Sequence, residues 1–271
     1  MRAGLILAVV ASLVGTPSLA AEPVLLHAAG SLRAALTEVA GAFETSAGLR
    51  VTGRFGASGL LKDEIAGGAK AEVFASANME HPRALADAGR SGQPVLFARN
   101  RLCALARPGF DLSTATVIDR MLDLGVKLGT STPKADPSGD YAWDVFRKIE
   151  SARPGSFALL DGKALQLTGG PSSPPAPAGR SVYGALVERR DADLFLTYCT
   201  NARVAAAEVA GAKVVDLPDS IAVGADYGLT VMTGASEGAY RLALFILSPA
   251  GQAVLERHGF SAPTRPNDSR P

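Results

Sequence analysis

The sequence predicts an α/β fold with a largely parallel sheet. Short apolar runs such as Val24-Leu25-Leu26 and Val73-Phe74-Ala75 alternate with longer segments whose apolar residues recur at three- and four-residue spacing. Gly48, Gly67-Gly68 and Gly89 follow three of these longer segments, in the position that ends a helix. Strands that alternate with helices in this way are typical of βα units sharing one sheet.

The first 21 residues have the pattern of a secretory signal peptide. Arg2 gives a positive start, residues 5–14 form an apolar core, and Ser18-Leu19-Ala20 or Leu19-Ala20-Ala21 supplies the small residues of a cleavage site. The apolar run is too short to remain in a bilayer as a helix. We therefore expect a signal peptide over 1–21, cleaved near Ala20 or Ala21, and export to a bacterial periplasm.

The composition excludes some classes of function. The chain has 27 basic and 26 acidic residues, so it lacks the basic excess of a nucleic-acid-binding protein. Its three His and two Cys are too few and too scattered to predict a metal cluster. In an oxidising compartment, Cys103 and Cys199 could form a disulfide or remain two small buried thiols. The sequence leaves both alternatives open.

Ser31 lies where the first strand gives way to the first helix. The helix is indicated by the apolar face of Leu32, Leu36, Val39 and Phe43. A serine at this point either caps its own helix or marks an anion site, because a helix start presents unpaired N–H groups and the positive end of a dipole. On this stretch alone, capping is the simpler interpretation.

The same order of strand, small residues, serine and helix recurs at Ser58. A strand over 49–55 precedes Gly56-Ala57-Ser58-Gly59-Leu60, and a helix follows that ends at Gly67-Gly68. Further helices are expected over 79–88, 111–124, 141–150, from Val182, over 204–210 and over 237–247, with further strands over 71–77, 102–106, 126–130, 165–168, 194–198, 213–217 and 226–232. The Pro-rich segment 169–179 is predicted to be a loop that serves as a linker or the edge of a lid, and a disordered tail is expected over 263–271.

Taken in order, these segments resemble the periplasmic molybdate-binding proteins of ABC importers. The resemblance covers roughly Val24 to Phe260. It is carried by the segments Ala28-Ala29-Gly30-Ser31-Leu32, Phe55-Gly56-Ala57-Ser58-Gly59-Leu60, Ala71 to Ala77, Asp136 to Ala142, Leu186 to Tyr198, Ser248 to Ala253 and His258-Gly259-Phe260. Each segment is weak alone, whereas their order and spacing together are specific.

The resemblance implies a two-lobe type II binding-protein fold in which two strands cross between the lobes. Residues 22–98 and 226–262 would form lobe I, and residues 99–225 would form lobe II. It also implies a monomer that uses no cofactor and no protein-ligated metal cation, is not an enzyme, and hands a tetrahedral oxyanion to a membrane permease. Molybdate is the first expectation for this oxyanion, and tungstate the second.

The resemblance also implies the ligand-binding residues. Hydroxyl groups would come from Ser31, Ser58 and Tyr198, and backbone N–H groups from Ala142 and Val182, with Arg180 or Ser181 as alternatives to Val182. Such a cage holds a dianion with oriented donors. A lining without acceptors would reject ligands that still carry a proton, because that proton would be left unpaired.

Three features depart from the family pattern. Asp140 lies beside the expected anion site, where it either caps the helix over 141–150 or repels a dianion; we favour capping. The Pro-rich segment precedes Arg180, and Cys199 follows Tyr198. These departures affect the choice of ligand more than the fold.

Other functions are compatible with parts of the sequence. The same scaffold could bind another anion or a small organic ligand, or act as a sensor. A serine hydrolase is a remote alternative, because Ser58, Asp226 and His258 occur in hydrolase order. However, Leu60 stands where a nucleophile elbow needs glycine.

Overall fold

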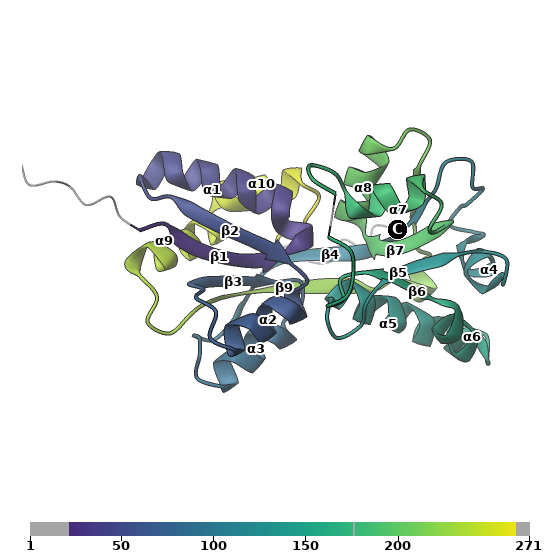
Figure 1. The fold of residues 1–271 in the computed structure, drawn as a ribbon, viewed down its shortest axis with the longest axis horizontal. Helices are drawn as coiled ribbons and strands as arrows, with labels where there is room; N and C mark the ends of the chain where they lie inside the picture. The colour runs from purple at the N-terminus through teal and green to yellow at the C-terminus, as the bar shows by residue number, and fades with distance from the viewer. Residues whose placement is uncertain (1–21, 176, 264–271) are drawn as a thin grey trace, which may run out of the picture.

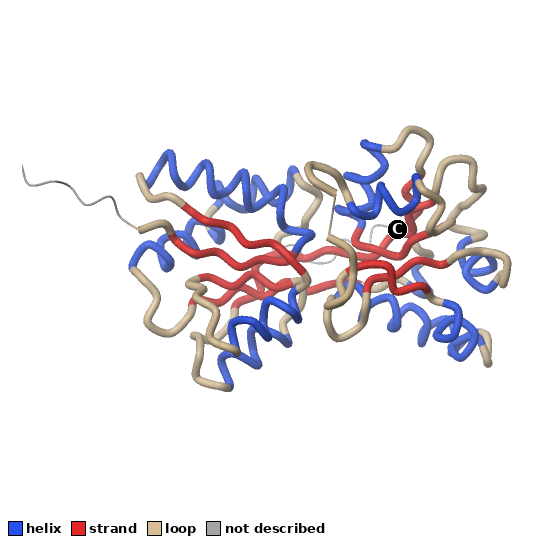
Figure 2. The backbone as a smooth tube through the Cα atoms, in the orientation of Figure 1, coloured by secondary structure: helices blue, strands red, loops and turns tan. Residues whose placement is uncertain are grey.

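The computed structural model describes residues 22–175 and 177–263, which form two lobes side by side (Figure 1). Each lobe has a sheet with helices on both faces (Figure 2), as the alternation of apolar runs and amphipathic segments predicts. The α/β class with two crossing strands is confirmed. The expected signal peptide and nearly all of the expected tail lie outside the described residues.

In the first lobe, β1 (Val24–Ala29) pairs in parallel with β2 (Val51–Gly56) and with β3 (Val73–Ser76). A short turn, η1 (Gly30–Leu32), leads from β1 into α1 (Arg33–Ala47). Helices α1, α9 (Glu237–Leu247) and α10 (Pro249–Arg257) cover one face of the sheet, and α2 (Ser58–Ala66) and α3 (Glu80–Asp87) cover the other (Figure 1).

In the second lobe, β5 (Leu128–Ser131) pairs in parallel with β6 (Leu165–Thr168) and with β7 (Leu194–Tyr198). Helices α5 (Pro137–Ala152) and α6 (Ser156–Lys163) lie on one side of this sheet, and α7 (Val182–Glu188) and α8 (Cys199–Glu208) on the other (Figure 1). The short helix α4 (Val117–Leu122) lies at the far end, and β8 (Lys213–Asp216) with the turn η2 (Asp219–Ile221) leads back to the first lobe.

Two strands run through both lobes. The strand β4 (Val95–Ala106) pairs antiparallel with β9 (Gly224–Val231) as far as Arg101, and from Leu102 onward with β7 and β8. The predicted lobe boundaries, after residues 98 and 225, fall within these two strands. Because β4 and β9 are hydrogen-bonded to each other, they form a paired connection between the lobes.

The core follows from the apolar runs. Every residue of β3 and of β7 is buried, as expected for strands covered on both faces. One buried cluster continues from Leu26 and Phe43 in the first lobe to Phe146 and Leu196 in the second. None of the helices in the described part of the chain is long and apolar enough to span a membrane.

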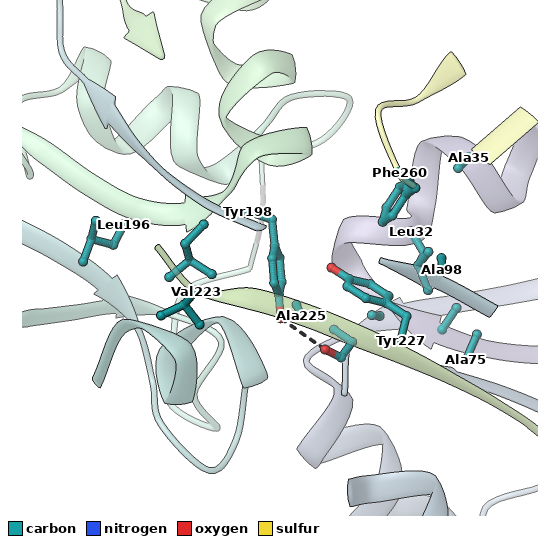
Figure 3. Close-up of a cluster of buried hydrophobic side chains, with 14 of the residues drawn as sticks. Leu32, Ala35, Ala75, Ala98, Leu196, Tyr198, Val223, Ala225, Tyr227 and Phe260 are labelled. Carbon is teal, nitrogen blue, oxygen red and sulfur yellow. Dashed lines mark hydrogen bonds between the residues drawn. The ribbon is translucent and has the colours of Figure 1, made fainter. Parts of the chain in front are cut away.

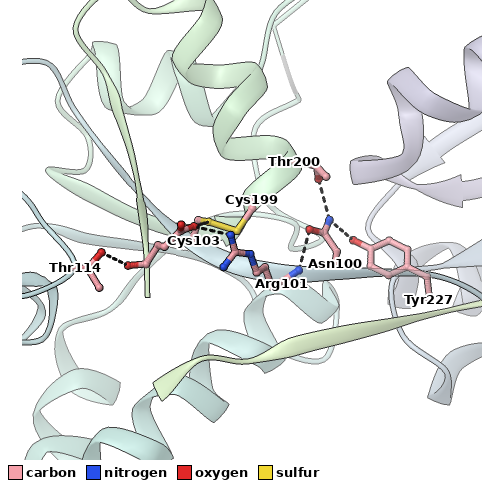
Figure 4. The surroundings of a disulfide bond; sticks show 8 residues. Asn100, Arg101, Cys103, Thr114, Cys199, Thr200 and Tyr227 are labelled. Atoms are coloured by element: carbon pink, nitrogen blue, oxygen red, sulfur yellow. Dashed lines mark hydrogen bonds and ion pairs between the residues drawn. A yellow bond between two sulfur atoms is a disulfide. The ribbon is translucent and has the colours of Figure 1, made fainter. Parts of the chain in front are cut away.

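The structure decides between the two alternatives for the cysteines. Cys103 on β4 and Cys199 at the start of α8 form a disulfide, with Cα atoms 4.8 Å apart (Figure 4). The bond therefore ties a crossing strand to the helix that follows β7.

Three expected elements begin earlier than predicted. The strand expected over 102–106 begins at Val95, and the helix expected over 204–210 begins at Cys199. The helix predicted over 141–150 begins at Pro137, because Asp136 caps it by accepting a hydrogen bond from the Ser138 N–H at 3.1 Å. An Asp before a Pro is the usual start signal of a helix, since the fixed φ of proline suits the first helical position. Asp140 therefore lies inside the first turn, and its expected role as the cap is wrong.

Candidate functional site

A cleft of about 780 Å³ lies between the lobes, and both lobes contribute to its walls. It opens where the parallel strands end: β1 and β2 on one side, β6 and β7 on the other. Ligands of open α/β sheets bind at this edge, because helix N-termini converge there. The lining includes Ser31, Arg33 and Phe55 from the first lobe and Asp136, Val182 and Tyr198 from the second.

Ser31 lies at the base of the cleft. It belongs to the turn η1, whose N-cap is Ala29, and its side chain caps no helix, so the capping interpretation is wrong. Its hydroxyl is instead hydrogen-bonded to the Tyr227 hydroxyl at 2.9 Å. The Asn100 side-chain N–H₂ group also lies 3.4 Å from that tyrosine oxygen (Figure 4). This network orients the serine hydroxyl from a crossing strand.

Tyr198 ends β7 and is 1% exposed. Its hydroxyl donates a long hydrogen bond, 3.5 Å, to the Ala77 carbonyl oxygen in the other lobe (Figure 3). Its ring centroid lies 5.6 Å from that of Tyr227. Burial, followed by the negative charge of the neighbouring phenols when ionised, raises the pKa of Tyr198 well above its usual value. The hydroxyl therefore remains a hydrogen-bond donor at any physiological pH.

Val182 is the first residue of α7 and lines the cleft. No preceding turn can accept a hydrogen bond from its N–H, because the helix begins there. The two alternatives are engaged elsewhere. The Ser181 N–H donates to the Glu208 carboxylate at 2.8 Å, and the Arg180 N–H donates to the Pro177 carbonyl oxygen at 3.2 Å. The Arg180 guanidinium pairs with Glu188 at 2.9 Å.

Ser58 and Ala142 do not line the cleft. Ser58 is 1% exposed, and its Oγ accepts a hydrogen bond from the Ala77 N–H at 3.1 Å. Ala142 lies in the second turn of α5, so it is not at a helix start as the resemblance implies. The cleft thus brings together Ser31, Val182 and Tyr198 of the five expected residues.

Asp136 and Glu208, not Asp140, are acidic residues that line the cleft. Asp140 does not line it, and its Oδ1 accepts a hydrogen bond from the Lys134 N–H at 2.8 Å. Burial raises the pKa of Asp136 to about 6, although the nearby Ser138 N–H and Ser131 hydroxyl partly oppose this shift. Within the described residues, no ion pair involves the Asp136 carboxyl.

Arg33 gives the cleft a positive charge. Its Nη2 donates to the Phe55 carbonyl oxygen at 3.2 Å, and its guanidinium lies 4.9 Å from the centroid of the Phe55 ring. Sequence reasoning missed Arg33 and Asp136 as lining residues. The Asp136-Pro137 pair was a usable signal, because it places a helix start, and hence the cleft edge, at Asp136.

The Pro-rich segment forms one wall of the cleft. Gly169, Gly170, Ser173, Pro174, Pro175 and the stretch 177–180 all line it. The expectation of a loop is confirmed. Its proline rings give this wall an apolar surface.

The residues of the remote hydrolase alternative are not joined to one another. Ser58 Oγ is bound to the Ala77 N–H, Asp226 pairs with Arg99 at 3.0 Å, and His258 Nε2 lies 2.7 Å from a Glu38 carboxylate oxygen. Because each group has another partner, the structure offers no Ser–His–Asp relay through them.

Comparison with known proteins identifies the family. Residues 24–261 match the family model of bacterial extracellular solute-binding proteins. The uncharacterized protein PM1146 of Pasteurella multocida is 37% identical over 237 residues, which cover 86% of this chain and 96% of that protein. The molybdate-binding protein ModA of Mycobacterium bovis is 27% identical over 253 residues, which cover 91% of this chain and 87% of that protein.

Solved structures share the fold. The periplasmic molybdate-binding protein of Azotobacter vinelandii superposes with a TM-score of 0.70 at 20% identity, covering 89% of this chain and 99% of that one. The sulfate-binding protein SubI of Mycobacterium tuberculosis superposes with a TM-score of 0.74 at 18% identity, covering 90% and 88%. The two-lobe fold and the match over nearly all described residues lead to one conclusion: the chain belongs to the family of bacterial extracellular solute-binding proteins.

Proposed function

We propose that this protein captures a tetrahedral oxyanion in the periplasm and delivers it to the permease of an ABC importer. Molybdate is the first candidate ligand, and tungstate the second. The observation that carries the proposal is the convergence of three donors from distant segments, the Ser31 hydroxyl, the Val182 N–H and the Tyr198 hydroxyl, on one cleft between the lobes.

The chemistry of these donors suits an anion. Two are hydroxyl groups, and the third is the first N–H group of a helix. Hydrogen bonds to a charged acceptor contribute roughly 1.5–3 kcal/mol each, about twice a neutral pair. Arg33 adds a positive charge at the cleft wall. The 27% identity to a protein named as molybdate-binding supports molybdate as the ligand to test first.

A small organic anion is the second candidate. The cleft volume of about 780 Å³ lies within the roughly 300–1,000 Å³ typical of sites for drug-sized ligands. Phe55, Leu60 and the prolines of the 169–179 loop give part of its wall an apolar surface. Such a wall would contact the carbon skeleton of an organic acid, whereas a bare oxyanion has nothing to place there.

Calorimetry on the mature chain decides between these ligands. We expect binding of molybdate or tungstate in a panel that also contains sulfate, phosphate and small organic acids. Saturating ligand should also raise the thermal midpoint, since a ligand at 100 times its Kd stabilises a protein by about 2.7 kcal/mol. Binding of an organic acid alone would replace the first candidate by the second.

Variants test the site itself. Ser31→Ala and Tyr198→Phe should each weaken binding roughly 10- to 100-fold, because each removes a hydrogen bond to a charged ligand. Tyr240→Phe is the matched control, since Tyr240 is 52% exposed on α9 and does not line the cleft. Wild-type affinity in both site variants would reject this placement of the ligand.

A further inference from the structure

The Asp136 carboxyl group is the feature of the cleft that an anion-binding role does not explain. It lines the same cavity as Ser31, Val182 and Tyr198. Its Oδ1 accepts the Ser138 N–H at 3.1 Å and so holds the start of α5. Among the described residues this carboxyl group has no ion-pair partner, although Arg33 and Arg180 line the same cleft.

The position of the carboxyl group is tightly defined. Its Oδ2 lies against Gly169, where a Cβ atom would come within 2.6 Å of that oxygen. Gly169 has a φ of +79°, a conformation that favours glycine. Ser131 and Ser138, both fully buried, lie next to this carboxyl group, and the Ser131 hydroxyl and the Ser138 N–H favour its charged form. The side chain therefore cannot move away from an incoming anion without displacing the 169–170 turn.

Two negatively charged acceptors facing each other repel, but a proton between them turns the contact into a hydrogen bond. We propose that the cleft binds its oxyanion together with one proton, which Asp136 shares with the ligand. This inference rests on the proposed function. It makes Asp136 a specificity-determining residue, because the ligand must either bring that proton or leave Asp136 to take it up from water.

The other ionisable groups around Asp136 cannot replace it in this role. Burial raises the pKa values of Tyr183, Tyr198 and Tyr227, so these phenols stay protonated. Arg33 and Arg180 stay charged. Glu208 is held by Arg180 and by the Ser181 N–H, and Asp140, whose charge also acts on Asp136, is held by the Lys134 N–H.

The pKa of Asp136, about 6, makes the effect measurable. Molybdate carries no proton at neutral pH, so Asp136 must take one up when molybdate binds. We expect the affinity for molybdate to fall about 50-fold between pH 6 and pH 8, since the neutral fraction of Asp136 falls by that factor. At pH 8, calorimetry in buffers of different ionisation enthalpy should show uptake of about one proton per molybdate and of none per hydrogen phosphate, which brings its own.

Asp136→Asn tests the assignment, because asparagine caps a helix almost as well as aspartate but stays neutral. The variant should bind molybdate with no pH dependence between 6 and 8, and about 100-fold more tightly than the wild type at pH 8. Asp140→Asn is the matched control, since it removes an acid four residues away that does not line the cleft. It should keep a pH-dependent affinity, with the fall displaced to slightly lower pH because the charge of Asp140 contributes to the raised pKa of Asp136.

The outcomes separate this inference from the function on which it rests. If molybdate binds with the same pH dependence in the wild type and in Asp136→Asn, the shared proton is rejected while the oxyanion function stands. Loss of all binding in Asp136→Asn, with pH-independent binding in the wild type, rejects it equally. If no oxyanion binds any variant even at pH 5.5, both the function and the inference are rejected.

Discussion

Gly59→Ala is expected to force the two lobes apart. Gly59 lies in the first turn of α2 in the first lobe, and its N–H donates to the Ala135 carbonyl oxygen of the second lobe at 2.9 Å. A Cβ atom on Gly59 would lie 2.6 Å from the Ala135 oxygen and closer still to the Lys134 oxygen. Both are backbone atoms, so no side chain can swing aside to make room.

The loop that carries these oxygens is held at both ends. The Asp136 N–H donates to the Thr132 carbonyl oxygen at 2.9 Å, and the Lys134 N–H donates to Asp140 at 2.8 Å. Overpacking costs about 1–3 kcal/mol. The arrangement of the lobes seen here is therefore disfavoured by about 1–3 kcal/mol relative to the wild type, or roughly 5- to 150-fold in population.

Small-angle scattering and calorimetry measure the two consequences. Gly59→Ala should have a larger radius of gyration than the wild type and should bind its ligand roughly 5- to 150-fold more weakly, because closure around the ligand is penalised. Gly41→Ala is the matched control: Gly41 lies within α1, and a Cβ atom there would meet nothing within 4 Å. That variant should be more stable by up to about 1 kcal/mol, since alanine favours a helix.

One result would refute the reasoning. If Gly59→Ala shows the scattering profile of Gly41→Ala but a thermal midpoint several degrees lower, the 132–136 loop rather than the lobe gives way. Unchanged scattering together with unchanged affinity would mean that the contact between α2 and Ala135 does not restrain the lobes at all.

Three further predictions concern stability. Replacing both Cys103 and Cys199 by serine should lower the free energy of unfolding by roughly 2–5 kcal/mol, because the disulfide closes a loop with a sequence separation of 96. Denaturant titrations measure this difference. Equal midpoints for the variant and the oxidised wild type would contradict the prediction. The pKa of Asp136 is raised to about 6, so this group contributes up to roughly 3 kcal/mol of stability below pH 4. That contribution is lost as pH rises to 6. In thermal scans at successive pH values, the stability of Asp136→Asn should therefore increase relative to that of the wild type over this range. His81 has the opposite pH dependence, because burial, followed by the charge of Lys62, lowers its pKa to about 4. Its contribution to stability is present above pH 6.5 and is lost as pH falls to 4. His81→Gln should therefore lose less stability in acid than the wild type in the same scans.

Local patterns predict most of the elements, because the spacing of apolar residues that indicates a strand or a helix involves only residues close together in the sequence. The strand over 194–198 and the helix start at Val182 lie where the pattern places them. The pattern failed at α6 (Ser156–Lys163), which was not expected, and at the start of α5, which was expected at residue 141 and lies at Pro137. In the second case a capping signal was present but was outweighed by the run of turn-forming residues around it.

The site was predictable only in part. Ser31 and Tyr198 line the cleft as the resemblance to molybdate-binding proteins implies, but the reason for the orientation of Ser31 is Tyr227, 196 residues later in the chain. Asp136 lines the cleft and Asp140 does not, although only one helical turn separates them. The side chain of Asp140 points to the Lys134 N–H, while Asp136 lies at the edge shared with Gly169.

The sequence by itself determined the alternation of strands and helices, the nearly neutral composition, and the serines at the starts of the first two α-helices of the described chain. Those features depend on residues a few positions apart. Only the tertiary structure decided that the cysteines are bonded, that Ser58 is covered by Ala77 and that Asp136 faces the cleft. These outcomes depend on how the two lobes pack together around strands β4 and β9. A pattern of neighbouring residues does not specify which side chains this packing buries and which it leaves in the cleft.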